Sequence, residues 1–211
     1  MNVFLDLDGT LVDPFDGISR CVAHALRSQN LQVPPLDSLR WVIGPALIES
    51  FEKLGTPDPE AALASYRERY SSVGMLEAEP YPGLLDALAK LRAAGHTLYL
   101  MTSKPHVFAR QITAKFGIAE FLEEQYGTEL DGTWNDKADL LAHALQKTGN
   151  SAETCVMVGD RIHDILAGQR NSVATVAALW GFGTPDETDR ADRQAESIAD
   201  LPSVISNFQI T

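Results

Sequence analysis

The fold is decided by the stretch VFLDLDGTLV, which spans residues 3–12. Its apolar start predicts a short buried strand, and Gly9 with its polar neighbours predicts the turn that ends the strand. Side chains of a strand alternate between faces, so Asp6 and Asp8 point to the same side at its C-terminal end. Buried strands rarely hold even one acid unless a cation or a hydrogen-bond network balances the charge. The stretch therefore predicts a charged site at the end of the first strand.

The size and charge of the chain limit the kinds of partner it can have. A chain of 211 residues forms one large domain or a main domain with a smaller insert, and a hydrophobic content of 45% supplies a sizeable core. The net charge of -12 argues against a nucleic-acid polymer or an anionic membrane as partner, because both require a basic surface. A small anionic substrate is compatible with this charge if the site supplies local positive charge. Both a monomer and a homodimer fit the sequence.

Cysteine content and the N-terminus bear on the compartment. Cys21 and Cys155 lie among apolar neighbours, and their spacing matches neither a metal knuckle nor a disulfide framework. The N-terminus lacks the basic start and apolar run of a secretory signal, and the sequence has no apolar segment long enough to cross a bilayer. We therefore expect a reduced compartment, the cytoplasm.

A helical insert is predicted directly after the first strand. Strand-like runs vanish from about residue 15 to residue 79, and apolar residues recur at helical spacing. The pattern predicts three helices, one ending before Pro34-Pro35, one over Asp37–Leu54 with a break near Gly44-Pro45, and one over Ala61–Val73. The segment 79–83, which contains two prolines and a glycine, marks the return of the chain from the insert to the core. The expected domains are an all-helical insert, 14–80, and a core made of 1–13 and 81–211.

The rest of the chain alternates helix and strand, which predicts an α/β core with a Rossmann-like parallel sheet and helices on both faces. The expected strands are His96–Met101, Phe121–Tyr126, Thr154–Val158 and Val173–Leu179. The expected helices are Gly83–Ala94, a segment ending near Phe116, Asp136–Thr148 and Arg161–Gln169, and a last helix or strand lies near 198–208. Thr102–Pro105 is expected to be a turn.

Polar clusters follow several of these strands or open the next helix. Ligands of parallel α/β sheets bind outside the carboxyl ends of the strands, so we expect these clusters to converge there. They are Asp6/Asp8, Thr102/Ser103/Lys104, Lys137 and Asp160/Asp164.

The acids among them predict a hard-cation site. Asp6, Asp8 and Asp160 offer only oxygen ligands and a strong negative charge, which suits Mg²⁺ and disfavours zinc. Asp160 and Asp164 are four residues apart, so both face the same side of the helical turn that begins there.

The remaining polar residues suit a phosphoryl group. Thr102 offers a hydroxyl donor and Lys137 an ammonium, although Lys104 competes with Lys137 for this role. A carboxylate such as Asp6 can attack phosphorus to give an aspartyl phosphate, and a second one such as Asp8 can protonate the leaving oxygen and then activate water.

Four motifs, in their order and spacing, resemble those of the haloacid dehalogenase superfamily. They are Asp6-Leu7-Asp8-Gly9-Thr10-Leu11, Thr102-Ser103-Lys104-Pro105, Lys137 before an apolar helix, and Gly159-Asp160-Arg161-Ile162-His163-Asp164. The helical insert resembles the C1 cap of that superfamily. Residues 43–47 with Ser50-Phe51, together with Trp180-Gly181-Phe182-Gly183, resemble its phosphoglycolate-phosphatase-like branch.

The resemblance implies roles for these residues. Asp6 would be the nucleophile and a Mg²⁺ ligand, and Asp8 the general acid and base that also gives its backbone carbonyl to the metal. Asp160 would complete the metal site, with Asp164 as a further metal-side acid. Thr102, Ser103 and Lys137 would bind the phosphoryl group, although Ser103 stands where the branch commonly has asparagine.

Substrate selection is expected to fall to the insert. Arg20, Arg40, Gly44 and Pro45 are candidates for reading the leaving group, and solvated helix faces are the alternative interpretation.

The leading hypothesis is a Mg²⁺-dependent phosphatase of a small phosphorylated metabolite, such as phosphoglycolate or a related phosphomonoester. A sugar phosphomutase or a nucleotidase would use the same core. A phospho-receiver domain and a phosphate-binding module without turnover are the non-enzymatic alternatives.

Overall fold

The computed structural model describes residues 1–44 and 46–208. The chain divides into two compact units, one made of Met1–Val12 and Pro80–Thr211 and the other of Asp13–Glu79. We call the first the core unit and the second the inserted unit. The sequence predicted an insert at 14–80, and its assignment as a C1 cap stays a prediction.

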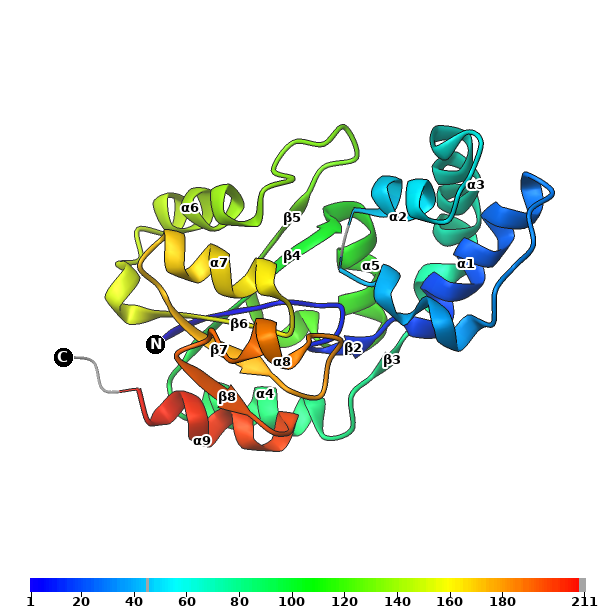
Figure 1. Ribbon diagram of the computed structural model, residues 1–211. Helices are drawn as coiled ribbons and strands as arrows, with labels where there is room; N and C mark the ends of the chain where they lie inside the picture. The colour runs from blue at the N-terminus through cyan, green and yellow to red at the C-terminus, as the bar shows by residue number, and fades with distance from the viewer. Residues whose placement is uncertain (45, 209–211) are drawn as a thin grey trace. The chain divides into compact units, whose positions relative to one another are not determined.

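The core unit is a six-stranded sheet in the order β5-β4-β1-β6-β7-β8, and its strands pair in parallel (Figure 1). This confirms the predicted Rossmann-like fold class. The strands are β1 (Asn2–Leu5), β4 (Thr97–Pro105), β5 (Leu122–Thr128), β6 (Cys155–Gly159), β7 (Ala174–Ala178) and β8 (Arg193–Ala195).

Helices cover both faces of this sheet. On one face lie α6 (Lys137–Thr148) and α7 (Ile162–Arg170), and on the other lie α4 (Leu84–Ala93) and α9 (Leu201–Ser206), as Figure 1 shows. The helix α5 (His106–Lys115) contacts β4 and β5, and α8 (Pro185–Thr188) is a single turn beside α7. Short 3₁₀ helices, labelled η, are η3 (Ala119–Phe121), η4 (Ala152–Thr154) and η5 (Ile198–Asp200).

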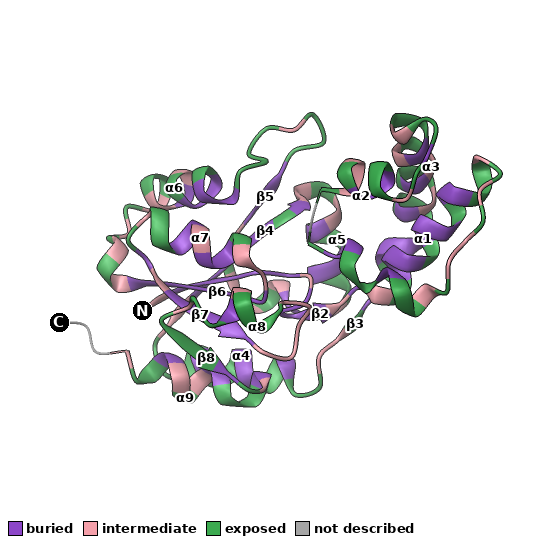
Figure 2. Cartoon of the chain, viewed as in Figure 1, coloured by how far each residue is buried: buried purple, intermediate pink, exposed green. Residues whose placement is uncertain are grey.

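Burial explains why the central strands read as unbroken apolar runs. Every residue of β6 is buried, and so are three of the four residues of β1, because helices cover both faces (Figure 2). Phe4 stacks on Tyr99 of the neighbouring strand with ring centroids 4.8 Å apart. Their cluster continues through Met101, Leu141 and Met157 to the underside of α6. The packed core thus fixes the strand ends, where the polar residues stand.

One strand is longer than expected. The sequence predicted a turn at Thr102–Pro105, whereas β4 continues to Pro105. The pairing with β5 shifts register between Thr102 and Pro105, so this segment is an irregular strand end instead of a free turn. The hydroxyl of Thr128 donates to the Ser103 carbonyl at 3.1 Å and holds the irregular segment on β5.

The inserted unit is helical, as predicted. It contains α1 (Phe15–Ser28), η1 (Leu36–Val42), α2 (Leu47–Lys53), α3 (Pro59–Ser72) and η2 (Gly74–Leu76). One predicted helix was wrong in part, because the segment 36–42 is 3₁₀ helix instead of the first half of an α-helix. Two prolines precede it, and the chain is extended again at Ile43, so the segment never gains the length that favours an α-helix.

The chain passes between the two units twice, at neighbouring places. The strands β2 (Val12–Asp13) and β3 (Glu79–Pro80) form a separate two-stranded sheet. Next to it, the backbone N–H of Tyr81 donates to the Leu11 carbonyl at 3.2 Å. Among the described residues, no helix combines the length and the apolar character needed to span a membrane.

Candidate active site

The turn after β1 places two acids at the carboxyl edge of the sheet. Asp6 still belongs to the sheet hydrogen bonding, since its N–H donates to the Val158 carbonyl at 2.9 Å. Gly9 then adopts a φ of +85°, a left-handed conformation that glycine reaches without strain. A Cβ atom at Gly9 would also lie 2.3 Å from the carboxylate of Asp160. Gly9 therefore lets the turn carry Asp8 past the strand end and leaves room for Asp160.

Asp160 follows β6 and is fully buried. Its Oδ1 accepts a hydrogen bond from the Thr10 hydroxyl at 3.3 Å, and its Oδ2 accepts one from the Phe182 N–H at 2.7 Å. The indole of Trp180 donates to the Thr10 carbonyl at 3.0 Å, so the same loop also holds the turn after β1. The Trp180–Gly183 segment thus orients Asp160, which is a function that sequence reasoning did not assign to it.

Gly181 is required by the close approach of this loop to the acid. A Cβ atom there would lie 2.3 Å from Asp160 Cβ and 2.5 Å from the Gly9 carbonyl oxygen. Replacing Gly181 with alanine is expected to cost about 2 kcal/mol or more of stability, the upper part of the range for overpacking, and to displace Asp160. We expect a matching loss of turnover, measured alongside the urea unfolding midpoint.

The control for this substitution is Gly117→Ala. Gly117 has a φ of +70° with open space around its Cβ position, so alanine there meets backbone strain of about 1 kcal/mol and no steric clash. Turnover should survive in Gly117→Ala. Equal turnover in the two variants would contradict the positioning function of the loop.

Asp164 lies at the start of α7 and serves two purposes. Its Oδ2 accepts a hydrogen bond from the Arg161 N–H at 2.9 Å and so caps the helix. Its Oδ1 forms an ion pair with Lys137. Burial raises the pKa of Asp164, against the opposing effect of Lys137. One oxygen is therefore held by the backbone, and the other faces the charged site.

Lys137 is the first residue of α6, and its side chain reaches two of the acids. Asp136 caps that helix by accepting from the N–H groups of Ala138 and Asp139. The Lys137 side chain is 5% exposed, and its Nζ lies 2.7 Å from Asp6 Oδ1 in addition to its ion pair with Asp164. Burial alone would lower the pKa of Lys137, but the two carboxylates outweigh burial and raise it. Lys137 is therefore a fixed buried cation.

Three of the acids form a group that can hold a cation. Asp6, Asp160 and Asp164 are all buried, and each offers a carboxylate oxygen within 4.8 Å of the others. Burial and the neighbouring Asp164 and Asp6 raise the pKa of Asp160 well above its ordinary range. Lys137 balances part of this charge, and a divalent cation with oxygen ligands fits the remainder.

The sequence named Asp6, Asp8, Asp160 and Asp164 as the acids of the metal site, and the structure groups three of them, Asp6, Asp160 and Asp164. The Asp8 carboxylate pairs instead with Lys104, Oδ2 to Nζ at 2.6 Å. A metal contact from the Asp8 backbone carbonyl stays a prediction.

The two competing lysines thus have different partners. Lys137 pairs with Asp6, and Lys104, with a side chain 5% exposed, pairs with Asp8. Burial raises the pKa of Asp8 against the lowering effect of Lys104. The Oδ1 atom of Asp8 is buried and has no hydrogen-bond partner among the described residues. Asp8 therefore has one oxygen paired with a cation and one buried oxygen without a partner among the described residues.

The residues of the second motif stand on the neighbouring strand. Leu5 of β1 is in register with Leu100 of β4, so Thr102 lies just past the end of β1. Thr102 is buried, and its Oγ1 accepts a hydrogen bond from the Lys104 N–H at 3.2 Å. Ser103 has an exposed side chain, and its contact with a phosphoryl group stays a prediction.

The candidate specificity residues all belong to the inserted unit. Arg20 pairs with Asp16 at 2.7 Å and with Glu77 at 3.1 Å, and Arg40 lies over the Phe15 ring at 5.2 Å. Gly44 is exposed with a φ of +106°, and Pro45 lies outside the described residues. Their function in substrate selection stays a prediction.

Comparison with known proteins agrees with this geometry. The family model of haloacid dehalogenase-like hydrolases matches residues 3–178. The chain belongs to this family. Phosphoglycolate phosphatases are among its relatives at 28–29% identity, which supports the predicted resemblance to that branch.

Two curated relatives and one solved structure are more similar. A 5'-nucleotidase of Pseudomonas aeruginosa is 42% identical over 206 residues, covering 96% of this chain and 93% of that protein. The tyrosine-protein kinase PtkA of Mycobacterium tuberculosis is 38% identical over 189 residues, covering 89% of this chain and 65% of that protein. The crystal structure of a predicted phosphatase from Clostridium acetobutylicum superposes with a TM-score of 0.91 at 32% identity, covering 97% of each chain.

Proposed function

We propose that this hydrolase is a Mg²⁺-dependent phosphatase that acts on a small phosphorylated metabolite through an aspartyl-phosphate intermediate. The family and the phosphatase and nucleotidase relatives make the chain a phosphoric monoester hydrolase. The observation that carries the proposed mechanism is the division of the two lysines between the two acids of the first motif.

Asp6 is proposed as the nucleophile. Lys137 holds its Oδ1, so the carboxylate has a fixed orientation and its second oxygen is free to attack phosphorus. Attack forms the bond between Asp6 and phosphorus and breaks the bond between phosphorus and the ester oxygen. Lys137 and the hydroxyl of Thr102 are suited to the phosphoryl oxygens, whose charge must be balanced in the transition state.

Asp8 is proposed to move the protons. Burial raises its pKa, and its unpaired Oδ1 is proposed to give a proton to the departing ester oxygen. The carboxylate that results takes a proton from a water molecule, which attacks the aspartyl phosphate. Inorganic phosphate then leaves, and Asp6 is regenerated as a carboxylate.

Asp6, Asp160 and Asp164 would hold the metal ion, with the Asp8 carbonyl as a further ligand. Bound Mg²⁺ would supply positive charge to the phosphoryl oxygens and lower the repulsion between the acids and an anionic substrate.

Removing the metal is expected to abolish turnover. We expect activity with a generic phosphomonoester to vanish in EDTA and to return with added Mg²⁺. We also expect Mg²⁺ to raise the thermal unfolding midpoint, because it binds the folded acid group and not the unfolded chain. Differential scanning calorimetry with and without Mg²⁺ measures this second effect without any substrate.

Asp160→Asn tests the site, with Asp86→Asn as its control. Asp86 is an exposed acid at the start of α4. The Mg²⁺-dependent rise in midpoint should be lost in Asp160→Asn and retained in Asp86→Asn. A rise of equal size in both variants would place the cation elsewhere.

A substrate panel tests the proposed activity. The similarity to a 5'-nucleotidase makes nucleoside 5'-monophosphates the first compounds to assay, and 2-phosphoglycolate and sugar phosphates follow. Phosphate release is measured without an acceptor sugar, because a phosphomutase would show little release under that condition. Multiple turnovers separate an enzyme from a receiver or a binding module.

A further inference from the structure

The inserted unit contains a cavity that the proposed chemistry does not use. It has a volume of about 770 Å³ and lies between α1, the segment 32–36 and α3. This volume is in the range that accommodates an organic ligand of nucleotide size. All ten of its lining residues belong to the inserted unit. The cavity therefore lies within that unit alone.

The lining of the cavity is basic, although the chain is acidic. Three arginines and one histidine face it, namely Arg20, His24, Arg27 and Arg69, and none of its lining residues is an aspartate or a glutamate. The whole chain carries a net charge of -12. The cavity therefore concentrates basic side chains on a chain that is acidic as a whole.

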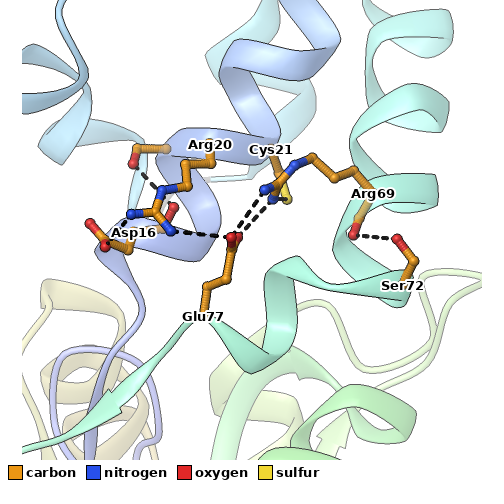
Figure 3. Close-up of polar contacts among 7 residues, drawn as sticks. Asp16, Arg20, Cys21, Arg69, Ser72 and Glu77 are labelled. Carbon is orange, nitrogen blue, oxygen red and sulfur yellow. Dashed lines mark hydrogen bonds and ion pairs between the residues drawn. The ribbon is translucent and has the colours of Figure 1, made fainter.

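Two of the arginines are already neutralised. Arg20 and Arg69 approach Glu77 from α1 and α3, at 3.1 Å and 2.8 Å, and Arg20 also pairs with Asp16 (Figure 3). These contacts raise the pKa of Arg69 and lower the pKa of Glu77. They fix the two guanidinium groups beside the cavity without adding net positive charge.

Arg27 and His24 provide the basic groups of the cavity that are not paired with any acid that the structure describes. Within the part of the chain that the structure describes, neither side chain forms a hydrogen bond or an ion pair, and both are exposed. They are three residues apart on α1, so they share one face of the helix. A guanidinium and an imidazole side by side form a donor pair that suits a phosphate group.

Part of the cavity lining is apolar. Val33, Pro34 and Leu36 form this apolar wall and are half-buried. A ligand that fills the cavity thus needs an anionic end for α1 and an apolar or planar part for this wall. We propose that the cavity binds an organic phosphate, with its phosphate at Arg27 and His24 and its organic part on Val33, Pro34 and Leu36.

The experiment uses ATP as the probe in the presence of EDTA. Without a cation, the acids Asp6, Asp160 and Asp164 repel a triphosphate, so binding in EDTA reports on a site elsewhere. Isothermal titration calorimetry on the full chain should show saturable binding of ATP. Tripolyphosphate should bind more weakly because it lacks the organic part, and adenosine should bind weakly because it lacks the phosphates.

Arg27→Ala is expected to weaken ATP binding at least about tenfold, which is the loss of one charge-assisted hydrogen bond. Arg27→Lys should give an intermediate affinity, since it keeps the charge and loses the planar donor pair. The control is Arg67→Ala, an exposed arginine of α3 outside the cavity, which should bind as the wild type does.

Backbone amide shifts in an NMR titration locate the site. We expect the ATP-dependent shifts to centre on residues 23–36 and to be absent from Gly9 and Gly159. Wild-type affinity in Arg27→Ala, shifts centred at Gly9 and Gly159, or no saturable binding would each overturn the inference. Equal affinity for tripolyphosphate and ATP would overturn the assignment of the apolar wall. None of these measurements depends on turnover, so they stand apart from a test of the proposed phosphatase.

Discussion

Asp6→Asn is expected to abolish turnover while the chain stays folded. Asparagine has the size of aspartate, and its side-chain oxygen can still accept from Lys137, but its amide cannot form a stable acyl phosphate. We expect a loss of about 10⁴-fold or more in kcat, the scale seen when a catalytic nucleophile is removed. Phosphate release from the preferred monophosphate of the substrate panel measures it.

Two further measurements make this prediction sharp. The circular dichroism spectrum and the urea unfolding midpoint should show that Asp6→Asn is folded. Trapping with a labelled substrate and acid quenching should give a phosphorylated wild-type chain and an unlabelled variant. Substantial turnover by Asp6→Asn would contradict the proposed nucleophile.

Lys137→Met is expected to damage both stability and activity. Lys137 is the buried cation that contacts Asp6 and Asp164, and Asp160 adds a third buried acid to the same group. Removing one partner of a buried ion pair leaves uncompensated charge, which costs about 3–5 kcal/mol. We expect a large fall in the urea midpoint in EDTA, together with a loss of phosphate release at saturating Mg²⁺.

Added Mg²⁺ should recover part of the stability of Lys137→Met, because the metal replaces some of the missing positive charge. Saturation at one hundred times the dissociation constant contributes about 2.7 kcal/mol. Turnover should stay low, since Mg²⁺ does not replace the ammonium that faces the phosphoryl group. Recovery of full activity with Mg²⁺ would show that Lys137 has only a structural function.

The control is Lys147→Met on the same helix. The side chain of Lys147 is 55% exposed, and its contact with Glu124 is 3.4 Å long. A surface pair of this kind contributes up to about 1 kcal/mol, so the variant should keep nearly wild-type stability and full turnover.

The fold was predictable because its signals are local. Each signal lies within a short stretch of neighbouring residues: the apolar run of β1, the apolar run of β6, and the glycine within the first motif. The alternation of helix and strand is likewise visible along the chain. What failed was local structure without such a signal. The strand β8 is three residues long, two of them polar, so no alternation marked it. The segment 36–42 had helical spacing but too little length.

The candidate site was predictable as a set of residues and not as a set of contacts. Order and spacing pointed to Asp6, Asp8, Thr102, Lys137 and Asp160. Which lysine meets which acid depends on the registration of β4 against β1 and on the start of α6, and residue order does not encode these directly. The support of Asp160 by the Phe182 N–H depends likewise on a loop that returns from 22 residues further along.

The hydrogen bond between Tyr81 and Leu11 has a consequence for how such enzymes diversify. Both ends of the inserted unit leave the core at neighbouring points, so an exchange of the segment between them leaves the path of the core chain almost unchanged. The residues proposed for the chemistry lie outside that segment, and the candidates for substrate choice lie within it. Evolution, or a protein engineer, could thus replace one module and keep the reaction.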